Sequence, residues 1–193
     1  ITPIYVTGDQ TKLTLGGDTA VVLEGRETAL SGNSNGDGAY VDGNAVFAME
    51  GNASLTAAYG PFLCRGAAFD ISGNAKVEAA YFAIDGNNTK GTMTINIADN
   101  ASLYSALDAA IYMPNVGTIN MTGGTIEGNW AGIHAKMGTI DISGGTVRAT
   151  GEKHIVDING SYTGNGEGGV NGGTSKDGSA IVLHSDIYTA NPS

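Results

Sequence analysis

Six side chains in the second half of the chain are of the types that bind sugars. A tryptophan or tyrosine ring stacks on the apolar face of a sugar, and carboxylate and imidazole groups hydrogen-bond its hydroxyls. A carboxylate beside an imidazole could also supply the acid and base for cleaving a glycosidic bond. The candidate ligand-binding residues are Asp108, Tyr112, Trp130, His134, Glu152 and His154.

These side chains share one face only if the chain repeats. Ile111, Ile133 and Ile155 lie 22 residues apart, and each marks a short apolar run. If the three isoleucines occupy equivalent inward positions, Tyr112 and His134 follow them by one residue and should point outward. The two rings would then lie side by side on the surface of neighbouring coils.

The same spacing makes Asp108, Trp130 and Glu152 equivalent, which would place a carboxylate on each side of the indole ring. A plainer interpretation is that Trp130 packs against a neighbouring loop while the other side chains form a solvated face. We favour the plainer interpretation, because single exposed apolar side chains are common on protein surfaces.

A phrase of alternating apolar residues followed by a short turn recurs five times and supplies the elements that would position these groups. Its anchors are Gly51, Gly73, Asp99, Gly123 and Gly144, at intervals of 22, 26, 24 and 21 residues. The alternation is typical of a strand with one buried face, and Gly and Asn tolerate the positive φ of a turn. A repeat of this length leaves no room for a crossover helix and predicts a solenoid.

We therefore predict an all-β fold, a right-handed parallel β-helix of about seven to nine coils with a period of roughly 21–26 residues. Stacked coils turn each repeat position into a ladder of side chains. The predicted ladders are Phe47/Phe69/Ile95/Ile119/Ile140 and Met49/Ile71/Ile97/Met121/Ile142 inside, Asn52/Asn74/Asn100 at the turn, and a stacked pair Tyr59/Tyr81 at an edge.

The chain is expected to form a single β-helix domain over residues 1–193. An early copy of the phrase at residues 13–21 has its anchor, Gly17, 34 residues before Gly51, which predicts a loop insertion near residues 31–38. The Gly-rich stretch 160–178 predicts a second loop insertion, and residues 179–183 a last strand. Neither end carries an obvious cap, which favours a segment of a longer surface protein.

Composition narrows the classes of partner. The net charge is −10 and no basic run is present, which argues against nucleic acid as a partner. No long apolar segment is present, which argues against insertion into a membrane by this segment. The single cysteine, Cys64, follows the apolar Leu63 and is expected to be buried and inert, and it cannot form a disulfide within the chain.

The phrases at residues 117–126 and 138–147 resemble those of bacterial cell-surface right-handed β-helix proteins, of the autotransporter passenger and adhesin type within the pectin-lyase-like superfamily. The resemblance covers residues 45–158 well. It implies a secreted or surface-displayed structural or adhesive module, extracellular or on the bacterial cell surface. Its partners would be a glycan or a surface protein, or other copies of the chain through self-association.

The alternative is a polysaccharide lyase or glycoside hydrolase of the same fold, with a groove around Asp108 and His134. The Gly-His-Gly and Arg-Ile-Lys signatures of pectin-cleaving relatives are absent from the sequence. We therefore assign no catalytic residue, no metal ligand and no cofactor. Calcium is only weakly suggested, by a loop starting at Asp157 that lacks the glycine and the closing glutamate of a calcium loop.

Overall fold

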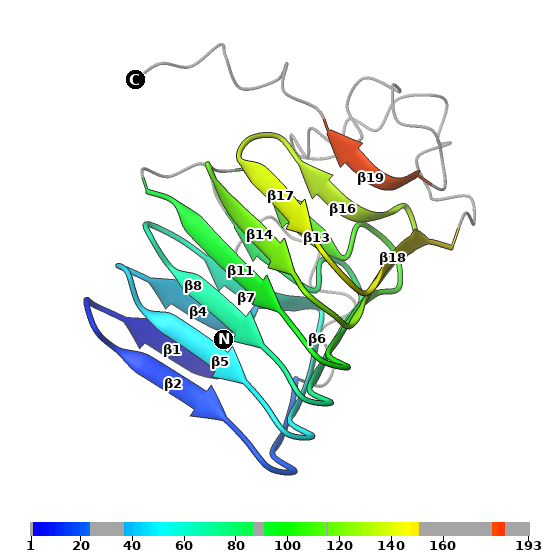
Figure 1. Ribbon diagram of the computed structural model, residues 1–193. Helices are drawn as coiled ribbons and strands as arrows, with labels where there is room; N and C mark the ends of the chain where they lie inside the picture. Colours follow the sequence, from blue (N-terminus) through cyan, green and yellow to red (C-terminus); the bar gives the residue numbers. More distant parts are fainter. Residues whose placement is uncertain (1, 24–36, 87–90, 115, 151–178, 184–193) are drawn as a thin grey trace.

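The computed structural model of the protein describes residues 2–23, 37–86, 91–114, 116–150 and 179–183. Within these ranges the regular elements are β-strands, and all their pairings are parallel. The strands stack coil upon coil into a β-solenoid with three sides (Figure 1). The predicted all-β, parallel solenoid is confirmed.

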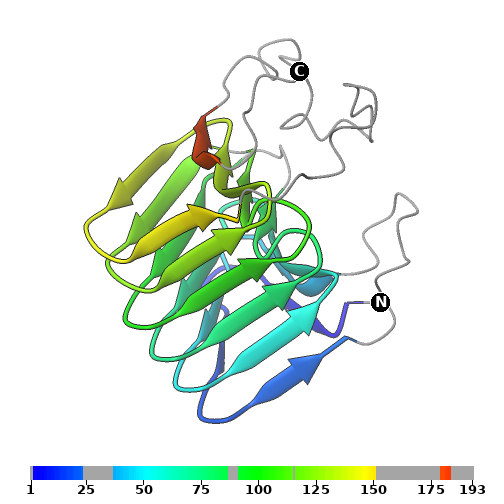
Figure 2. The ribbon, with the colours of Figure 1, turned by 90° about the vertical axis from the view of Figure 1, so that its right-hand side faces the viewer.

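Two sides of the solenoid are six-stranded sheets. Sheet 1 stacks β2 (Lys12–Leu15), β5 (Val46–Met49), β8 (Ala68–Ile71), β11 (Met93–Ile97), β14 (Gly117–Met121) and β17 (Thr139–Ile142). Sheet 2 stacks β3 (Ala20–Val22), β6 (Ser54–Ala57), β9 (Lys76–Ala79), β12 (Ser102–Ser105), β15 (Thr125–Gly128) and β18 (Thr146–Ala149). Each strand of sheet 1 leads through the repeated turn into a strand of sheet 2 (Figure 2).

The third side consists of two smaller sheets. One, sheet 3, holds β1 (Ile4–Thr7), β4 (Asp37–Asp42), β7 (Tyr59–Leu63) and β10 (Asp85–Gly86). The other, sheet 4, holds β13 (Ile111–Met113), β16 (Ala131–Ala135) and β19 (Ser179–Leu183). An isolated parallel bridge between Ile84 and Ile111 connects the two.

Six strands per sheet amount to about five turns, fewer than the predicted seven to nine coils. The prediction divided the whole chain length by the repeat. Residues 24–36 and 151–178 lie outside the described residues, however, so they contribute no coil to this count. Of the expected insertion near residues 31–38, residues 31–36 lie outside the described residues, and Asp37 and Gly38 are buried residues of β4. The expected loop at 160–178 lies outside the described residues.

The predicted inner ladders are confirmed residue by residue. Phe47 pairs with Phe69, Phe69 with Ile95, and the register continues through Ile119 to Ile140. The second ladder joins Met49, Ile71, Ile97, Met121 and Ile142 in the same way. Side chains in the middle coils are fully buried, whereas Ile142 in the last coil of sheet 1 is 38% exposed. A dry core therefore runs along the solenoid axis and opens at its end.

The turn between sheets 1 and 2 carries the predicted asparagine ladder. Asn100 donates its amide hydrogen to the Asn74 oxygen at 3.2 Å, and Asn74 donates to Asn52 at 3.0 Å. The ladder ends on a carboxylate, because Asn52 donates to Asp18 at 2.9 Å. Side-chain amides stacked in this way fix the register of successive coils.

The conformation of the turn between sheets 1 and 2 differs in the two coils that have Gly-Gly-Thr instead of an asparagine there. Gly51 and Gly73 have φ of +67°, and Asp99 has φ of +59°, so the first turn residue is left-handed in those coils. In the two Gly-Gly-Thr versions the second glycine takes this role, with φ of +83° at Gly124 and +93° at Gly145. Only glycine or a small polar residue adopts this conformation readily, which explains the repeated residue types.

Candidate functional site

The structure brings four of the predicted ligand-binding residues together, but in the interior. Trp130 is 1% exposed, His134 2%, Asp108 4% and Tyr112 7%. The prediction that Tyr112 and His134 point outward to solvent is wrong. Glu152 and His154 lie outside the described residues.

The pairing of Tyr112 with His134 is as predicted, and the side of the sheet is too. The two residues are neighbours in the register of β13 and β16, on the side opposite to the inward Ile111 and Ile133. That side is covered, because both strands are buried along their whole length. A parallel sheet buried on both faces is a common arrangement, and the period of two alone does not reveal the cover.

A second apolar cluster fills this side of the molecule. Its buried members are Phe82, Ala109, Tyr112, Trp130 and Ala131. The Phe82 and Tyr112 rings are stacked with centroids 5.1 Å apart, and the Trp130 and His134 rings meet edge-on at 5.0 Å. These contacts make Trp130 a packing residue, as the plainer interpretation expected. Its other part, a solvated face, is wrong for Asp108, Tyr112 and His134, because all three are buried.

Polar groups at this cluster are engaged locally. The Asp108 carboxylate accepts a hydrogen bond from the backbone of Ala109 at 2.8 Å, and the Asp108 backbone donates to the Ser105 hydroxyl at 3.0 Å. The Lys136 ammonium lies 5.1 Å from the centre of the Tyr112 ring, within the range of a cation–π contact. A sugar reaches the indole or the imidazole only if this packing opens.

The position in the sheet that we predicted for Ile155 is occupied by Ile181. The neighbour of Ile133 in the sheet is Ile181 of β19, and Val182 takes the place beside His134. Residues 179–183 form the predicted last strand, so the coil closes there and not at Ile155. The intervening stretch breaks the 22-residue interval on which the equivalence of Ile155 depended. Ile155 itself lies outside the described residues.

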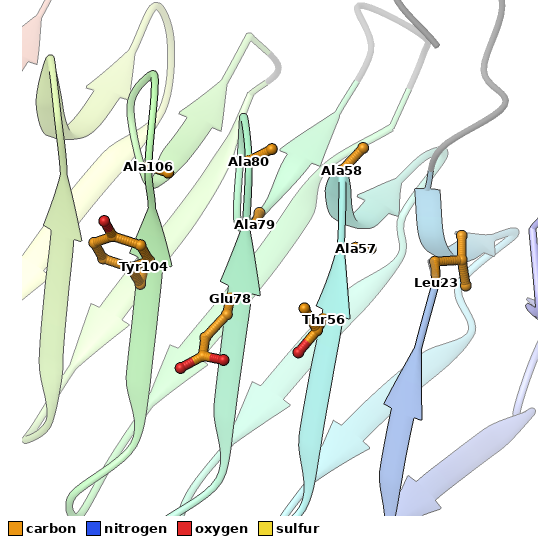
Figure 3. Close-up of a pocket in the computed structure, with 9 residues that line it drawn as sticks. All are labelled: Leu23, Thr56, Ala57, Ala58, Glu78, Ala79, Ala80, Tyr104 and Ala106. Carbon is orange, nitrogen blue, oxygen red and sulfur yellow. The ribbon is translucent and has the colours of Figure 1, made fainter. Parts of the chain in front are cut away.

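An open groove of about 280 Å³ crosses the outer side of sheet 2 (Figure 3). Alanines lie along it at the end of three neighbouring strands, where Ala58, Ala80 and Ala106 occupy successive coils. Their backbones stack through hydrogen bonds between neighbouring coils, such as Ala106 N–H to the Ala79 oxygen at 3.0 Å. Small side chains at one position of three coils leave the groove open.

Larger side chains border the groove. Tyr104 of β12 is 38% exposed, and Glu78 of β9 and Thr56 of β6 precede it in the same outward column. Leu23 borders the far end. The repeat pattern alone did not predict this groove. Its signal in the sequence is the pairs Ala57–Ala58 and Ala79–Ala80, which directly precede the tyrosines of the predicted stack.

The tyrosine stack itself is confirmed. The rings of Tyr59 and Tyr81 lie 5.0 Å apart with an angle of 18° between their planes. A longer stack that the sequence did not suggest follows β1, β4 and β7, where Tyr5 lies 4.9 Å from Tyr40 and Tyr40 lies 5.7 Å from Phe62. Equivalent aromatic side chains therefore stack from coil to coil outside the core as well as inside it.

A second, smaller concavity of about 180 Å³ lies on the outer side of sheet 1. Its polar groups are bonded to one another, because Asn120 donates to Asn96 at 2.8 Å and Asn96 donates to Asp70 at 2.7 Å. This second amide ladder also ends on a carboxylate. The arrangement holds coils together and presents no aromatic ring among the residues that line it.

Two carboxylates on β4 have shifted pKa values. Burial raises the pKa of Asp37 to about 6, and its Oδ2 has no hydrogen-bond partner among the described residues. The Arg65 guanidinium lowers the pKa of Asp42, whose Oδ1 accepts from Arg65 Nε at 2.7 Å. Asp42 and Arg65 thus form an ion pair with the carboxylate buried and the guanidinium in solvent.

Cys64 is buried, as predicted. Burial raises the pKa of its thiol, and the thiol lies 3.5 Å from the Tyr40 hydroxyl. A raised pKa removes the thiolate that a nucleophile or a metal ligand needs. Across the described ranges, no three His, Cys, Asp or Glu side chains are grouped as a metal site would need. The weakly suggested calcium loop at Asp157 falls outside those ranges.

Comparisons with protein-family models, curated proteins and solved structures found no match. The structure itself supports the resemblance to surface β-helix proteins at the level of the solenoid fold alone. Among the described residues, no helix has the length and the apolar character to cross a membrane.

Proposed function

We propose that the chain is a structural or adhesive module of a secreted or cell-surface protein, and that it holds a binding surface for a glycan or a protein on a rigid solenoid. The observation that carries this proposal is the continuity of the ladders. Two apolar ladders pass through five successive coils each. Such a stack resists bending, because every coil packs on its neighbours over its whole length.

The asparagine ladders support the same proposal. Both run along the axis through at least three coils and end on Asp18 or Asp70. Hydrogen bonds in a chain polarise one another, and a terminal carboxylate is a stronger acceptor than an amide. The chain obtains this order without a disulfide, since Cys64 is its single cysteine.

The net charge of the chain limits the kinds of ligand that it would bind. A net charge of −10 repels nucleic acid and anionic surfaces, and favours neutral or cationic ligands. The charge therefore favours a neutral glycan or a protein patch as the partner. The location outside the cell or on its surface follows from the resemblance to surface β-helix proteins and belongs to the same proposal. Self-association along the axis is a further prediction of this class, and sedimentation over a concentration series checks it.

The test is retention of ligands on the folded chain. The purified protein, immobilised through one end, is expected to retain at least one member of a panel of glycans and extracellular-matrix proteins. The control is the same protein unfolded in urea and washed under identical conditions. Retention by the unfolded control alone, or by neither sample, would contradict the proposal.

A further inference from the structure

We propose that the groove across sheet 2 is a binding site for a linear neutral glycan, with Tyr104 as the stacking residue and Glu78 and Thr56 as hydrogen-bonding residues. This inference rests on the proposed function and selects the glycan from its two classes of partner. Its basis is the shape, the exposed ring and the charge of the groove.

The shape requires an extended ligand. The groove crosses four consecutive coils, from Leu23 after β3 to Tyr104 and Ala106 of the coil of β12. With neighbouring strands about 4.8 Å apart, its length along the axis is roughly 14 Å. The groove is partly open to solvent. A chain that lies along the axis fits this space.

The side chains are those of a sugar site. Tyr104 is 38% exposed, and its ring lies on the outer side of the sheet beside Glu78 (Figure 3). The row of alanines gives an apolar surface against which a sugar ring can rest. A carboxylate and a hydroxyl in the preceding coils, from Glu78 and Thr56, are set to accept and donate hydrogen bonds. A mostly apolar lining with few placed polar groups is the general pattern of small-ligand sites.

The charge disfavours anionic ligands. Among the described residues that line the groove, Glu78 is the single charged group. Lys76 Nζ lies 3.3 Å from Glu78 Oε1, and both side chains are about half exposed, so the pair adds no strong positive field. A sulfated or uronic-acid chain would meet the carboxylate and the acidic protein together. Neutral hydroxyl groups meet neither penalty.

The backbone disfavours an extended peptide. Peptides that lie along a sheet bind by pairing with an exposed strand edge. Under the groove, β6, β9 and β12 are each paired on both sides, so they offer no free backbone edge. The concavity on sheet 1 is a poorer alternative, because its amides and carboxylate are already bonded to one another.

The experiment compares three variants on a panel of linear neutral oligosaccharides, including β-linked glucans, mannans and galactans, by calorimetry on the full chain. Tyr104→Ala is expected to weaken binding about tenfold, in the range of an aromatic contact. Ala80→Leu fills the groove and is expected to weaken binding at least as much. Tyr5→Ala is the matched control, because Tyr5 is a 65% exposed tyrosine on another side of the solenoid.

Each result of this experiment supports or overturns the groove as a site for a neutral glycan. Loss in Tyr104→Ala and Ala80→Leu with wild-type affinity in Tyr5→Ala, at unchanged urea midpoints, supports the site. Glycan binding that is unchanged in both groove variants overturns the site while the proposed function stands. Preference for uronic-acid or sulfated chains overturns the neutral ligand. If no glycan binds and a matrix protein does, the inference fails and the proposed function holds through its protein branch.

Discussion

The cost of removing one isoleucine from a core ladder should depend on the coil in which it lies. Ile97 and Ile142 occupy the same ladder position, but Ile97 is 1% exposed and Ile142 is 38% exposed. Replacing isoleucine by alanine removes three carbons, worth about 2.4 kcal/mol at full burial. For Ile142→Ala the exposed share reduces this to about 1.5 kcal/mol.

Ile97→Ala should cost more than the transfer of its atoms. Ile71 and Met121 hold the position from both sides, so the space cannot collapse and a cavity is left. With the cavity, we expect about 3–4 kcal/mol for Ile97→Ala, within the usual range for buried aliphatic residues. The two variants should therefore differ by about 2 kcal/mol, although the chemical change is the same.

Urea unfolding followed by far-UV circular dichroism measures both values. The midpoints give the difference in unfolding free energy if the slopes are equal, and the slopes themselves report whether terminal coils unfold separately. Equal costs for the two variants, or a larger cost for Ile142→Ala, would refute the continuous core that opens at its end.

Four other predictions follow from single residues. Asn74→Asp removes the amide donor to Asn52 and should lower the unfolding free energy by about 1–2 kcal/mol, measured in urea at neutral pH and refuted by an unchanged midpoint. Burial raises the pKa of Asp37 above its unfolded value, so the folded state loses stability as pH rises from about 4 to about 6 and stays at the lower level above that. Asp37→Asn should therefore stabilise the protein more at about pH 8 than at about pH 4, and the reverse order in thermal melts would contradict the burial. Cys64 should react with a thiol reagent only after unfolding, so rapid labelling of the native protein would oppose its burial. Trp130 is the single tryptophan, and its 1% exposure predicts blue-shifted fluorescence with weak acrylamide quenching, unlike a tryptophan on a sugar-binding surface.

The sequence predicted the parts of the fold that repeat in a fixed register. The phrase from Phe47 to Leu55 recurs with the same parity in each coil, so sheets 1 and 2 and their ladders could be aligned by eye. The third side carries no such phrase. Its connections vary in length. The Gly-rich stretch 160–178 was predicted as an insertion, but Ile155 lies at the same 22-residue spacing and was therefore matched to Ile133, whose neighbour in the sheet is Ile181.

For the site, the alternation of side chains along a strand predicted which face of the sheet each residue lies on, but not whether that face meets solvent. Tyr112 and His134 lie opposite to the inward isoleucines, as the spacing required. Whether that side meets solvent depends on Phe82, which comes from an earlier coil, and on Trp130, which directly precedes β16, because both pack in the cluster that holds Tyr112. The groove at Tyr104 was missed for a related reason, since a concavity depends on side-chain size at one position of several coils and not on any one motif.

Incubation of the folded protein with a panel of polysaccharides, followed by measurement of both retained ligand and newly formed chain ends, distinguishes a binding module from an enzyme. We expect retention of a neutral glycan without new chain ends, with and without calcium. New chain ends that disappear when Asp108 or His134 is substituted would contradict this expectation, and would show that the buried cluster opens to act as an enzyme.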